Sequence, residues 1–190
     1  MKRSRFHFAA LIAVILSVAA CSGDMTGGHH SSKTGMDQLF IQGMIPHHAD
    51  AIDMAEMALE KSQKDEIKKL AAEIIKAQES EIAMMKKWHK DWYGTDVPSF
   101  KKGDVSMGHG MSMNMSMMLM DLKELEKAPD FDKRFLEMMV DHHKMAVMMS
   151  GMIIDSRRAE MRKLAKEISI AQSDEIEAMI QWYIKWYGAW

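Results

Sequence analysis

Apolar residues recur at spacings of three and four positions in four stretches of this chain. The stretches are Phe40–Ala58, Leu70–Trp92, Phe135–Ile153 and Met161–Trp186. Because an α-helix turns by about 100° per residue, this spacing gathers the apolar residues on one helical face. The pattern therefore predicts four amphipathic helices and an all-α fold.

Breaks in the pattern place the ends of these helices. Short polar interruptions at 62–64 and 156–157 predict that the four helices form two antiparallel pairs. Gly94 and Gly188 follow the last apolar residues of the two pairs and are typical of helix C-termini. Pro46 lies inside the first helix and removes one backbone hydrogen bond, so we expect a local kink there rather than a break.

The two pairs are copies of one unit. Asp37–His48 returns 95 positions later as Asp132–His143, and Lys69–Gly94 returns 94 positions later as Lys163–Gly188. Two amphipathic pairs must bury their apolar faces against each other, which predicts a four-helix bundle over 36–188 built from two repeated helical hairpins. The first repeat spans 36–94, a Met-rich connector spans 95–129, and the second repeat spans 130–188.

The N-terminus has the layout of an export signal. Basic residues precede an apolar run that is too short to span a bilayer, and small residues follow it. Val18–Cys21 resembles the lipobox of bacterial lipoproteins, in which the cysteine is acylated and becomes the first mature residue. We therefore expect a signal peptide at 1–20, lipidation of Cys21 and a flexible tether at 21–35. Plain export with a free cysteine is the alternative.

The amino-acid composition argues against several classes of protein. The chain has 25 Lys and Arg against 27 Asp and Glu, so it lacks the basic excess of a nucleic-acid-binding protein. Its single cysteine excludes an internal disulfide and a cysteine-based zinc module. The anomaly is the 23 methionines, because methionine is not among the common residues.

Two motifs that each occur twice resemble a known family. One is MxxHHxxAxxM, from Met44 and again from Met139; the other is LAxEIxxAQxxEIxxMxxW, from Leu70 and again from Leu164. Together they are similar to the domain-of-unknown-function 305 family of ferritin-like bundles, which includes copper-tolerance proteins of the CopM type. The resemblance covers nearly all of Asp37–Gly188. It implies a ferritin-like four-helix bundle that binds copper, and silver in some members, outside the cytoplasm.

Methionines surround the paired histidines of each copy. His47 shares a helical face with Met44 and Met54, and His142 has thioethers one turn below and one and two turns above it. Sulfur combined with imidazole nitrogen selects monovalent copper, and we expect such sites to weaken below about pH 6 as imidazole protonates. The candidate ligands in the bundle are His47, His48, Met44, Met54, His142, His143, Met138, Met139, Met145 and Met149.

Core packing is the alternative for several of these residues. Methionine on a helical stripe usually fills gaps in a core, and we favour this interpretation for Met44, Met85, Met139 and Met179. For the four histidines, metal ligation and a shared polar core are both consistent with the pattern. Four residues near the middle of the second helices are expected to orient the imidazoles through hydrogen bonds. They are Gln78, Glu81, Gln172 and Glu175.

A second candidate site lies in the connector, where methionine alternates with serine and asparagine. Its candidate ligands are His109, Met111, Met113, Met115 and Met117. Core packing does not explain methionines among small polar residues and glycines. We favour a flexible metal-capture segment over a mobile hydrophobic contact surface.

The sequence favours a binding protein over an enzyme. It contains no nucleophilic-serine elbow, phosphate-cradling glycine loop or HExxH zinc motif, and no Glu is followed three places later by His, as a di-iron bundle requires. We expect a lipid-anchored protein of the bacterial cell envelope, periplasmic or on the outer surface. It would sequester or buffer monovalent copper, with silver as a second candidate, or hand the ion to copper-exporting or copper-accepting proteins. The alternatives are a metal-free lipoprotein interaction module with a Met-rich contact surface and a ferritin-like di-metal oxidoreductase.

Overall fold

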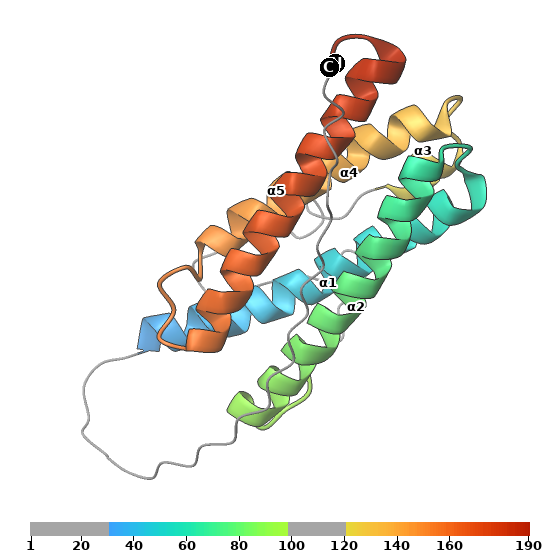
Figure 1. Ribbon diagram of the computed structural model, residues 1–190. Helices are drawn as coiled ribbons and strands as arrows, with labels where there is room; N and C mark the ends of the chain where they lie inside the picture. The colour runs from blue at the N-terminus through green and yellow to red at the C-terminus, as the bar shows by residue number, and fades with distance from the viewer. Residues whose placement is uncertain (1–30, 99–120) are drawn as a thin grey trace.

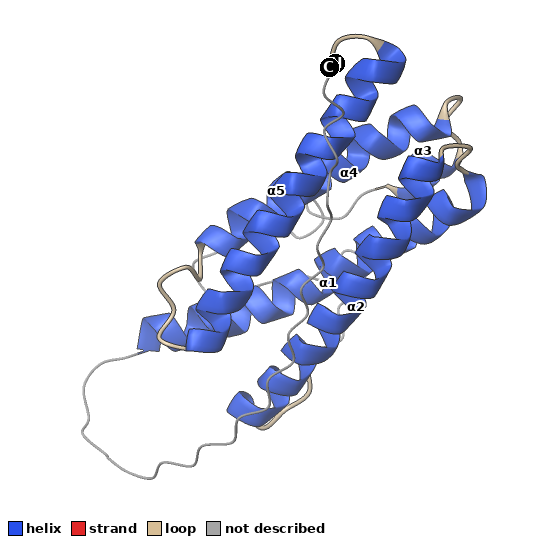
Figure 2. Ribbon diagram, in the orientation of Figure 1, coloured by secondary structure: helices blue, strands red, loops and turns tan. Residues whose placement is uncertain are grey.

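The described part of the chain is helical. A computed structural model describes residues 31–98 and 121–190, with side chains given from residue 35 onward in the first range. No strand occurs in these two ranges (Figure 2), which confirms the all-α prediction. Within the same residues, no helix has both the length and the apolar content needed to cross a bilayer. The helices are α1 (Ser31–Lys61), α2 (Asp65–Tyr93), α3 (Leu122–Glu126), α4 (Phe131–Gly151) and α5 (Ala159–Tyr187).

Two antiparallel helical hairpins make up the bundle (Figure 1). Helix α1 packs along α2, and α4 packs along α5. The two hairpins meet chiefly through α1 and α4. This arrangement confirms the pair of packed hairpins that the sequence repeat predicts.

The turn inside each hairpin is built in the same way in both copies. The backbone N–H of Lys64 donates to Ser62 Oγ at 3.1 Å, and the backbone N–H of Arg158 donates to Ser156 Oγ at 3.1 Å. Both serines are buried. A serine that binds the main chain two residues further on favours a turn over a continued helix, so these serines explain the breaks that the sequence shows.

Glycine ends the second helix of each hairpin, as the sequence predicts. Gly94 lies in the left-handed region, with φ 73°, and its N–H donates to the carbonyl oxygen of Lys90. Gly188 has φ 97°, and its N–H donates to the carbonyl oxygen of Ile184. Residues with a Cβ atom rarely adopt these dihedral angles, which explains why glycine stands at both positions.

Helix α1 extends further than the sequence pattern indicates. It begins at Ser31, inside the segment 21–35 that the sequence predicts to be a flexible tether. It also continues on both sides of Pro46. Proline removes a single backbone donor, and the burial of neighbouring residues such as Met44 and His47 stabilises the helix across that position.

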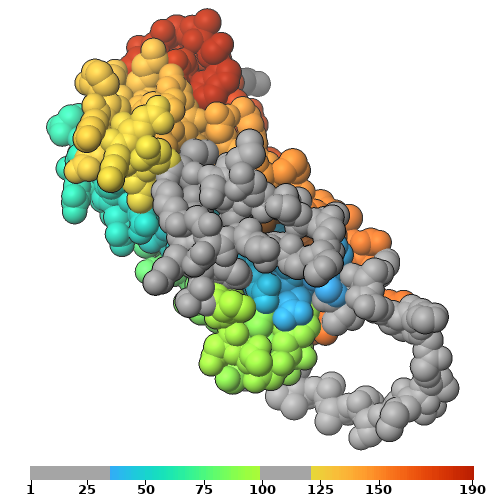
Figure 3. Space-filling model, turned by 180° about the vertical axis from the view of Figure 1, so that it is seen from behind, coloured from blue at the N-terminus to red at the C-terminus, as the bar shows by residue number. Residues whose placement is uncertain are grey.

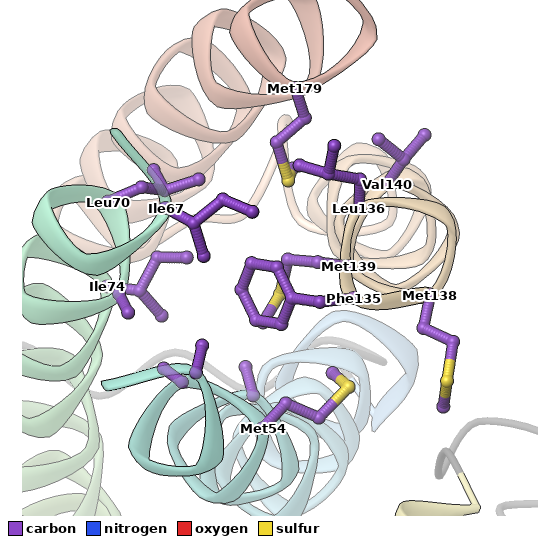
Figure 4. Packing of buried hydrophobic residues seen from close by; sticks show 14 of the residues in the cluster. Met54, Ile67, Leu70, Ile74, Phe135, Leu136, Met138, Met139, Val140 and Met179 are labelled. Atoms are coloured by element: carbon purple, nitrogen blue, oxygen red, sulfur yellow. The ribbon is translucent and has the colours of Figure 1, made fainter. Parts of the chain in front are cut away.

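Two apolar clusters fill the bundle. In Figure 4 the Phe135 ring occupies the middle of the first, cluster A, whereas Met138 points away from that centre. Cluster A consists of Ala51, Met54, Ala55, Ala58, Ile67, Leu70, Ala71, Ile74, Leu125, Phe135, Leu136, Met138, Met139, Val140, Met179 and Tyr183. Cluster B consists of Phe40, Ile41, Met44, Met85, Ala146, Met149, Ile153, Met161, Leu164, Ala165 and Ile168.

The short helix α3 covers the end of the bundle near the α1–α2 turn. It lies beside α1 and α4, as the yellow segment next to the turquoise end of α1 shows in Figure 3. Leu125 of α3 is fully buried in cluster A, and Lys61 Nζ donates to the carbonyl oxygen of Glu126 at 3.2 Å. Helix α3 therefore leads the chain into the second hairpin.

Candidate metal centre

A layer of polar side chains separates the two apolar clusters. Along α1, residues of cluster B come before the pair His47 and His48, and residues of cluster A follow the pair. Along α4 the order is reversed around His142 and His143, because the two helices run antiparallel. All four imidazoles are fully buried. The polar layer consists of His47, His48, Gln78, Glu81, His142, His143, Gln172 and Glu175.

The rings of His47 and His142 touch each other across the contact between the hairpins. Their centroids lie 3.7 Å apart, and the ring planes are inclined by 32°. Within residues 31–98 and 121–190, neither nitrogen of either ring has a hydrogen-bond partner. Buried polar atoms usually have one. Each neutral ring therefore offers one lone pair to which none of the described residues donates a hydrogen bond.

The second histidine of each pair is hydrogen-bonded within its own hairpin. His48 Nε2 lies 2.6 Å from Glu81 Oε2, and His143 Nε2 lies 2.7 Å from Glu175 Oε2. Because an ionised carboxylate only accepts, Nε2 of each ring carries the proton and Nδ1 holds the lone pair of the neutral form. The glutamates thus fix both the orientation and the tautomer of these imidazoles.

Each glutamate of the layer binds the second histidine of its own hairpin. The sequence predicts that Glu81 and Glu175 orient the imidazoles, and in the structure Glu81 binds His48 and Glu175 binds His143. Consecutive helical residues point about 100° apart, so only one histidine of each pair can face its own hairpin partner. Gln78 and Gln172 are buried in the layer, and their Oε1 atoms have no partner among the described residues.

The two halves of the layer are related by an approximate two-fold symmetry. The ring centroids of consecutive histidines are 6.2 Å apart and the ring planes are inclined by 54° in both copies. Asp50 breaks this symmetry, because its Oδ2 lies 3.8 Å from Nε2 of His142 while Met145 occupies the equivalent position in the second copy. One side of the layer therefore has a carboxylate where the other has a thioether.

Burial keeps the two touching imidazoles neutral. Burial, followed by the neighbouring His48 and His143, lowers the pKa of His47 from 6.5 to about 3. Burial and the surrounding histidines also lower the pKa of His142 well below 6.5. The cause is the cost of placing a charge in a medium of low polarity beside other groups that can become positive. The prediction that sites of this kind weaken below about pH 6 is therefore wrong for these two histidines, whose lone pairs stay free at lower pH.

Methionines border the layer on both sides. Met44 and Met149 lie in cluster B, and Met54, Met138 and Met139 lie in cluster A. Met145 is half-buried and packs against cluster B. Met85 and Met179, for which the sequence favours a packing role, are fully buried in the clusters. The structure thus places thioethers in the layers next to the imidazoles and gives most of them a role in packing as well.

The donor set of the layer consists of imidazole nitrogen with thioether sulfur nearby. Among the residues that the structure describes, no group of three or more histidine, cysteine, aspartate or glutamate side chains is arranged to hold a metal ion. Imidazole and thioether together suit soft monovalent ions better than hard divalent ions.

Several candidate residues lie outside the described ranges. They are Cys21, His109, Met111, Met113, Met115 and Met117. The lipid anchor and the connector site therefore stay predictions from the sequence.

His89 is a buried histidine that the sequence pattern does not single out. Its Nε2 lies 3.2 Å from Gln42 Nε2, and its Nδ1 lies 2.9 Å from the carbonyl oxygen of Thr95. The Gln42 amide donates to Nε2 and Nδ1 donates to the carbonyl, so both ring nitrogens are in use. Tyr183 stands at the equivalent place in the second copy, and this departure from the repeat is the signal that separates His89 from the histidines of the polar layer.

Comparison with protein families gives a match over residues 37–187. The matching family is described as a domain of unknown function, DUF305. Among curated proteins, the uncharacterized protein L153 of Acanthamoeba polyphaga mimivirus is 41% identical over 49 residues, which cover 26% of this chain and 32% of that protein. The match to this relative therefore spans about a third of its length.

Solved structures match over most of the bundle. CopM in the Cu(I)-bound form is 45% identical and has a TM-score of 0.69, with 80% of this chain and 98% of that chain covered. CopM in the Cu(II)-bound form is 47% identical with a TM-score of 0.70, over 80% and 97% of the two chains. A DUF305 fragment from Deinococcus radiodurans is 30% identical with a TM-score of 0.63, over 76% of this chain and 92% of that chain.

Proposed function

Because this chain belongs to the family of the domain of unknown function DUF305, we propose that it binds copper ions, chiefly the monovalent ion, at the polar layer of the bundle. The observation that carries the proposal is the contact between His47 and His142, two buried neutral rings whose nitrogens have no hydrogen-bond partner among the described residues. The similarity to CopM supports it, because CopM is described in Cu(I)-bound, Cu(II)-bound and Ag-bound forms.

The electrostatics of the layer favour a cation of low charge. Burying an unpaired charge is costly, and the cost falls when ligands and nearby groups of opposite charge compensate it. Imidazole and thioether are neutral ligands that supply soft lone pairs. Asp50 lies beside His142, and Glu81 and Glu175 each bind a histidine of the layer. These carboxylates would compensate the charge of the ion through the histidines that they contact, without binding the ion themselves.

Copper would be buffered or handed on outside the cytoplasm. The lipobox at Cys21 supports anchoring to the cell envelope. In an oxidising compartment thiols form disulfides, whereas thioethers and imidazoles stay competent as ligands. Acceptors for the ion would be copper-exporting or copper-accepting proteins. Mass spectrometry of the mature N-terminus tests whether Cys21 carries a lipid. A Cys21→Ser variant should no longer be attached to membranes.

A titration with monovalent copper against a competing chelator tests the bundle site. The informative variant is His47→Leu combined with His142→Leu, because leucine fills much of the imidazole volume and offers no ligand. We expect it to lose at least about tenfold in affinity, the scale on which metal sites respond to losses in their surroundings.

The matched control is His89→Gln, which replaces a buried histidine whose nitrogens are both hydrogen-bonded. It should bind copper as the natural chain does. Unchanged affinity and stoichiometry in the double variant would remove the polar layer as the binding site. Loss of binding in both variants would instead point to a loss of folding, which circular dichroism of each variant distinguishes.

A further inference from the structure

The buried imidazoles raise the question of where an ion first meets the protein. All four histidines of the polar layer have 0% of their surface exposed. An ion arriving from solvent must therefore lose its water to other donors before it reaches them. Donors for that step have to lie on the surface and to be soft, because a monovalent copper ion prefers sulfur and imidazole.

The C-terminal part of α4 presents such donors. Met148 is 56% exposed, and Met145 and Met152 on either side of it are half-buried. Met152 directly follows α4 and keeps a helical backbone, with φ −69° and ψ −22°. Spacings of three and four residues place these three thioethers on one face, about 5–6 Å apart at Cβ. We call Met145, Met148 and Met152 the thioether stripe.

Core packing accounts for only part of this local concentration of methionine. Met149, on the same part of α4, is buried in cluster B and packs as a core methionine does. Met148 instead leaves more than half of its surface in solvent. Thioethers are flexible and polarisable, so a stripe that is partly exposed can close around an ion without disturbing the core.

The stripe belongs to one copy of the repeat. In the first copy Asp50 and Asp53 stand where Met145 and Met148 stand in the second, and Asp53 is exposed. Carboxylates suit hard cations and thioethers suit soft ones. Within residues 31–98 and 121–190, the difference between the copies places thioethers on α4 where α1 has carboxylates.

The approximate two-fold symmetry connects the stripe to the polar layer. Asp50 Oδ2 lies 3.8 Å from His142 Nε2. Met145 stands at the place of Asp50 in the other copy, so by the same relation we infer that it lies on the side of the layer that holds His47. Met145 is half-buried and three residues from exposed Met148, and the nitrogens of His47 have no hydrogen-bond partner among the described residues.

We propose that the thioether stripe is a surface site for monovalent copper or silver, at which the ion is captured before it passes to the polar layer. Met148 and Met152 would receive the ion, and Met145 would link them to His47. This inference rests on the proposed function, because it supplies the entry step of the same binding process.

The test follows individual methionines in the full chain during a titration with Ag⁺, a monovalent probe that does not change oxidation state. Methionine methyl groups carry ¹³C, and single Met→Leu variants assign their NMR signals. We expect the first additions of Ag⁺ to shift the methyl signals of Met148 and Met152. We also expect a Met148→Leu, Met152→Leu double variant to load the polar layer at least about tenfold more slowly, because it lacks the local capture that raises the effective ion concentration.

The matched control is a Met57→Leu, Met84→Leu double variant. Both residues are half-buried methionines that pack against the clusters and lie outside the stripe. This control should load at the rate of the natural chain. It would show that the loss of two thioethers elsewhere has no effect.

The outcomes separate this inference from the proposed function. Shifts of the histidine ring signals, with unshifted Met148 and Met152 or with normal loading of the stripe variant, would overturn the stripe alone. Shifts of the methyl signals of the stripe without any shift of the histidine ring signals would support the surface site and contradict binding at the polar layer. Normal loading of the stripe variant together with loss of binding to another protein would overturn the capture site in favour of a contact surface.

Discussion

The two touching imidazoles at the centre of the bundle have opposite consequences for folding and for binding. Each ring is buried without a hydrogen-bond partner among the described residues, which costs stability on the order of 1–3 kcal/mol for each unsatisfied group. The same feature leaves lone pairs free to hold an ion. A ligand that binds the folded chain recovers part of that cost, so occupancy should stabilise the bundle.

The lowered pKa of His47 predicts that the folded chain loses stability in acid. Its folded pKa is about 3 against 6.5 in the unfolded chain, so between these values the unfolded state binds a proton that the folded state does not. Protonation of this imidazole does not affect the free energy of unfolding above pH 6.5. Below pH 6.5 the free energy of unfolding falls by up to about 1.4 kcal/mol per pH unit, until the pH reaches the folded pKa. His142 acts in the same direction.

Urea unfolding of the metal-free protein at pH 7.5 and pH 5 measures this effect. The difference in free energy of unfolding should be smaller by about 2 kcal/mol or more in the His47→Leu, His142→Leu variant, which has no imidazoles to protonate at these sites. Equal pH dependence in the two proteins would show that the buried rings do not control stability in acid.

At the scale of the helices, each hairpin carries its own stop signals. Ser62 and Ser156 turn the chain, and Gly94 and Gly188 end the second helices. These signals act through local backbone geometry and depend little on the rest of the bundle. Residues next to α2 and α5 in the sequence therefore determine where these two helices begin and end.

Alanine substitutions at two glycines separate the backbone effect from packing. Gly94→Ala should lower the free energy of unfolding by about 1 kcal/mol, because φ is 73° there and an added Cβ is strained although it meets no other atom within 4 Å. Gly151→Ala, at the last residue of α4 and also without a neighbour within 4 Å, should raise it by up to about 0.5 kcal/mol, because alanine favours the helix more than glycine does. Urea unfolding measures both, and a change of the same sign in the two variants would contradict the argument.

At the scale of the whole molecule, one contact joins three of the long helices. Arg158, at the start of α5, lies 2.9 Å from the Asp37 carboxylate of α1, and its guanidinium is 4.5 Å from the ring centroid of Trp92 in α2. Lys64 is the equivalent residue in the first copy, and its ammonium group is 5.0 Å from Trp186. A cation–π contact with a tryptophan therefore occurs at each end of the bundle. Arg158 also forms an ion pair with the buried carboxylate of Asp37.

Removing the two cations should have unequal effects. Arg158→Ala leaves the buried Asp37 without the guanidinium and should cost about 2 kcal/mol, somewhat less than a fully buried pair because Arg158 is partly exposed. Lys64→Ala should cost no more than about 1 kcal/mol, the scale of a cation–π contact near the surface. Thermal and urea unfolding of the two variants test the order, and equal losses would show that the ion pair to Asp37 adds nothing.

Much of the fold follows from the sequence, because periodicity and repetition are local properties. The stripes from Phe40 and Phe135 predict helices, the repeat predicts two like hairpins, and the glycines predict where they end. The start of α1 at Ser31 is not predictable in this way, because the segment is rich in serine and glycine and lacks an apolar stripe.

The chain alone determined which donors are present and on which helical faces they lie, because residue type and a constant turn per residue suffice for both. Only the tertiary structure decided that His47 meets His142 rather than a glutamate, that Glu81 and Glu175 bind the neighbouring histidines, and that Asp50 faces the other copy. The physical reason is that contacts between helices depend on how the two hairpins are rotated and shifted against each other. Packing of the apolar clusters fixes that geometry across the whole bundle, and no single segment encodes it.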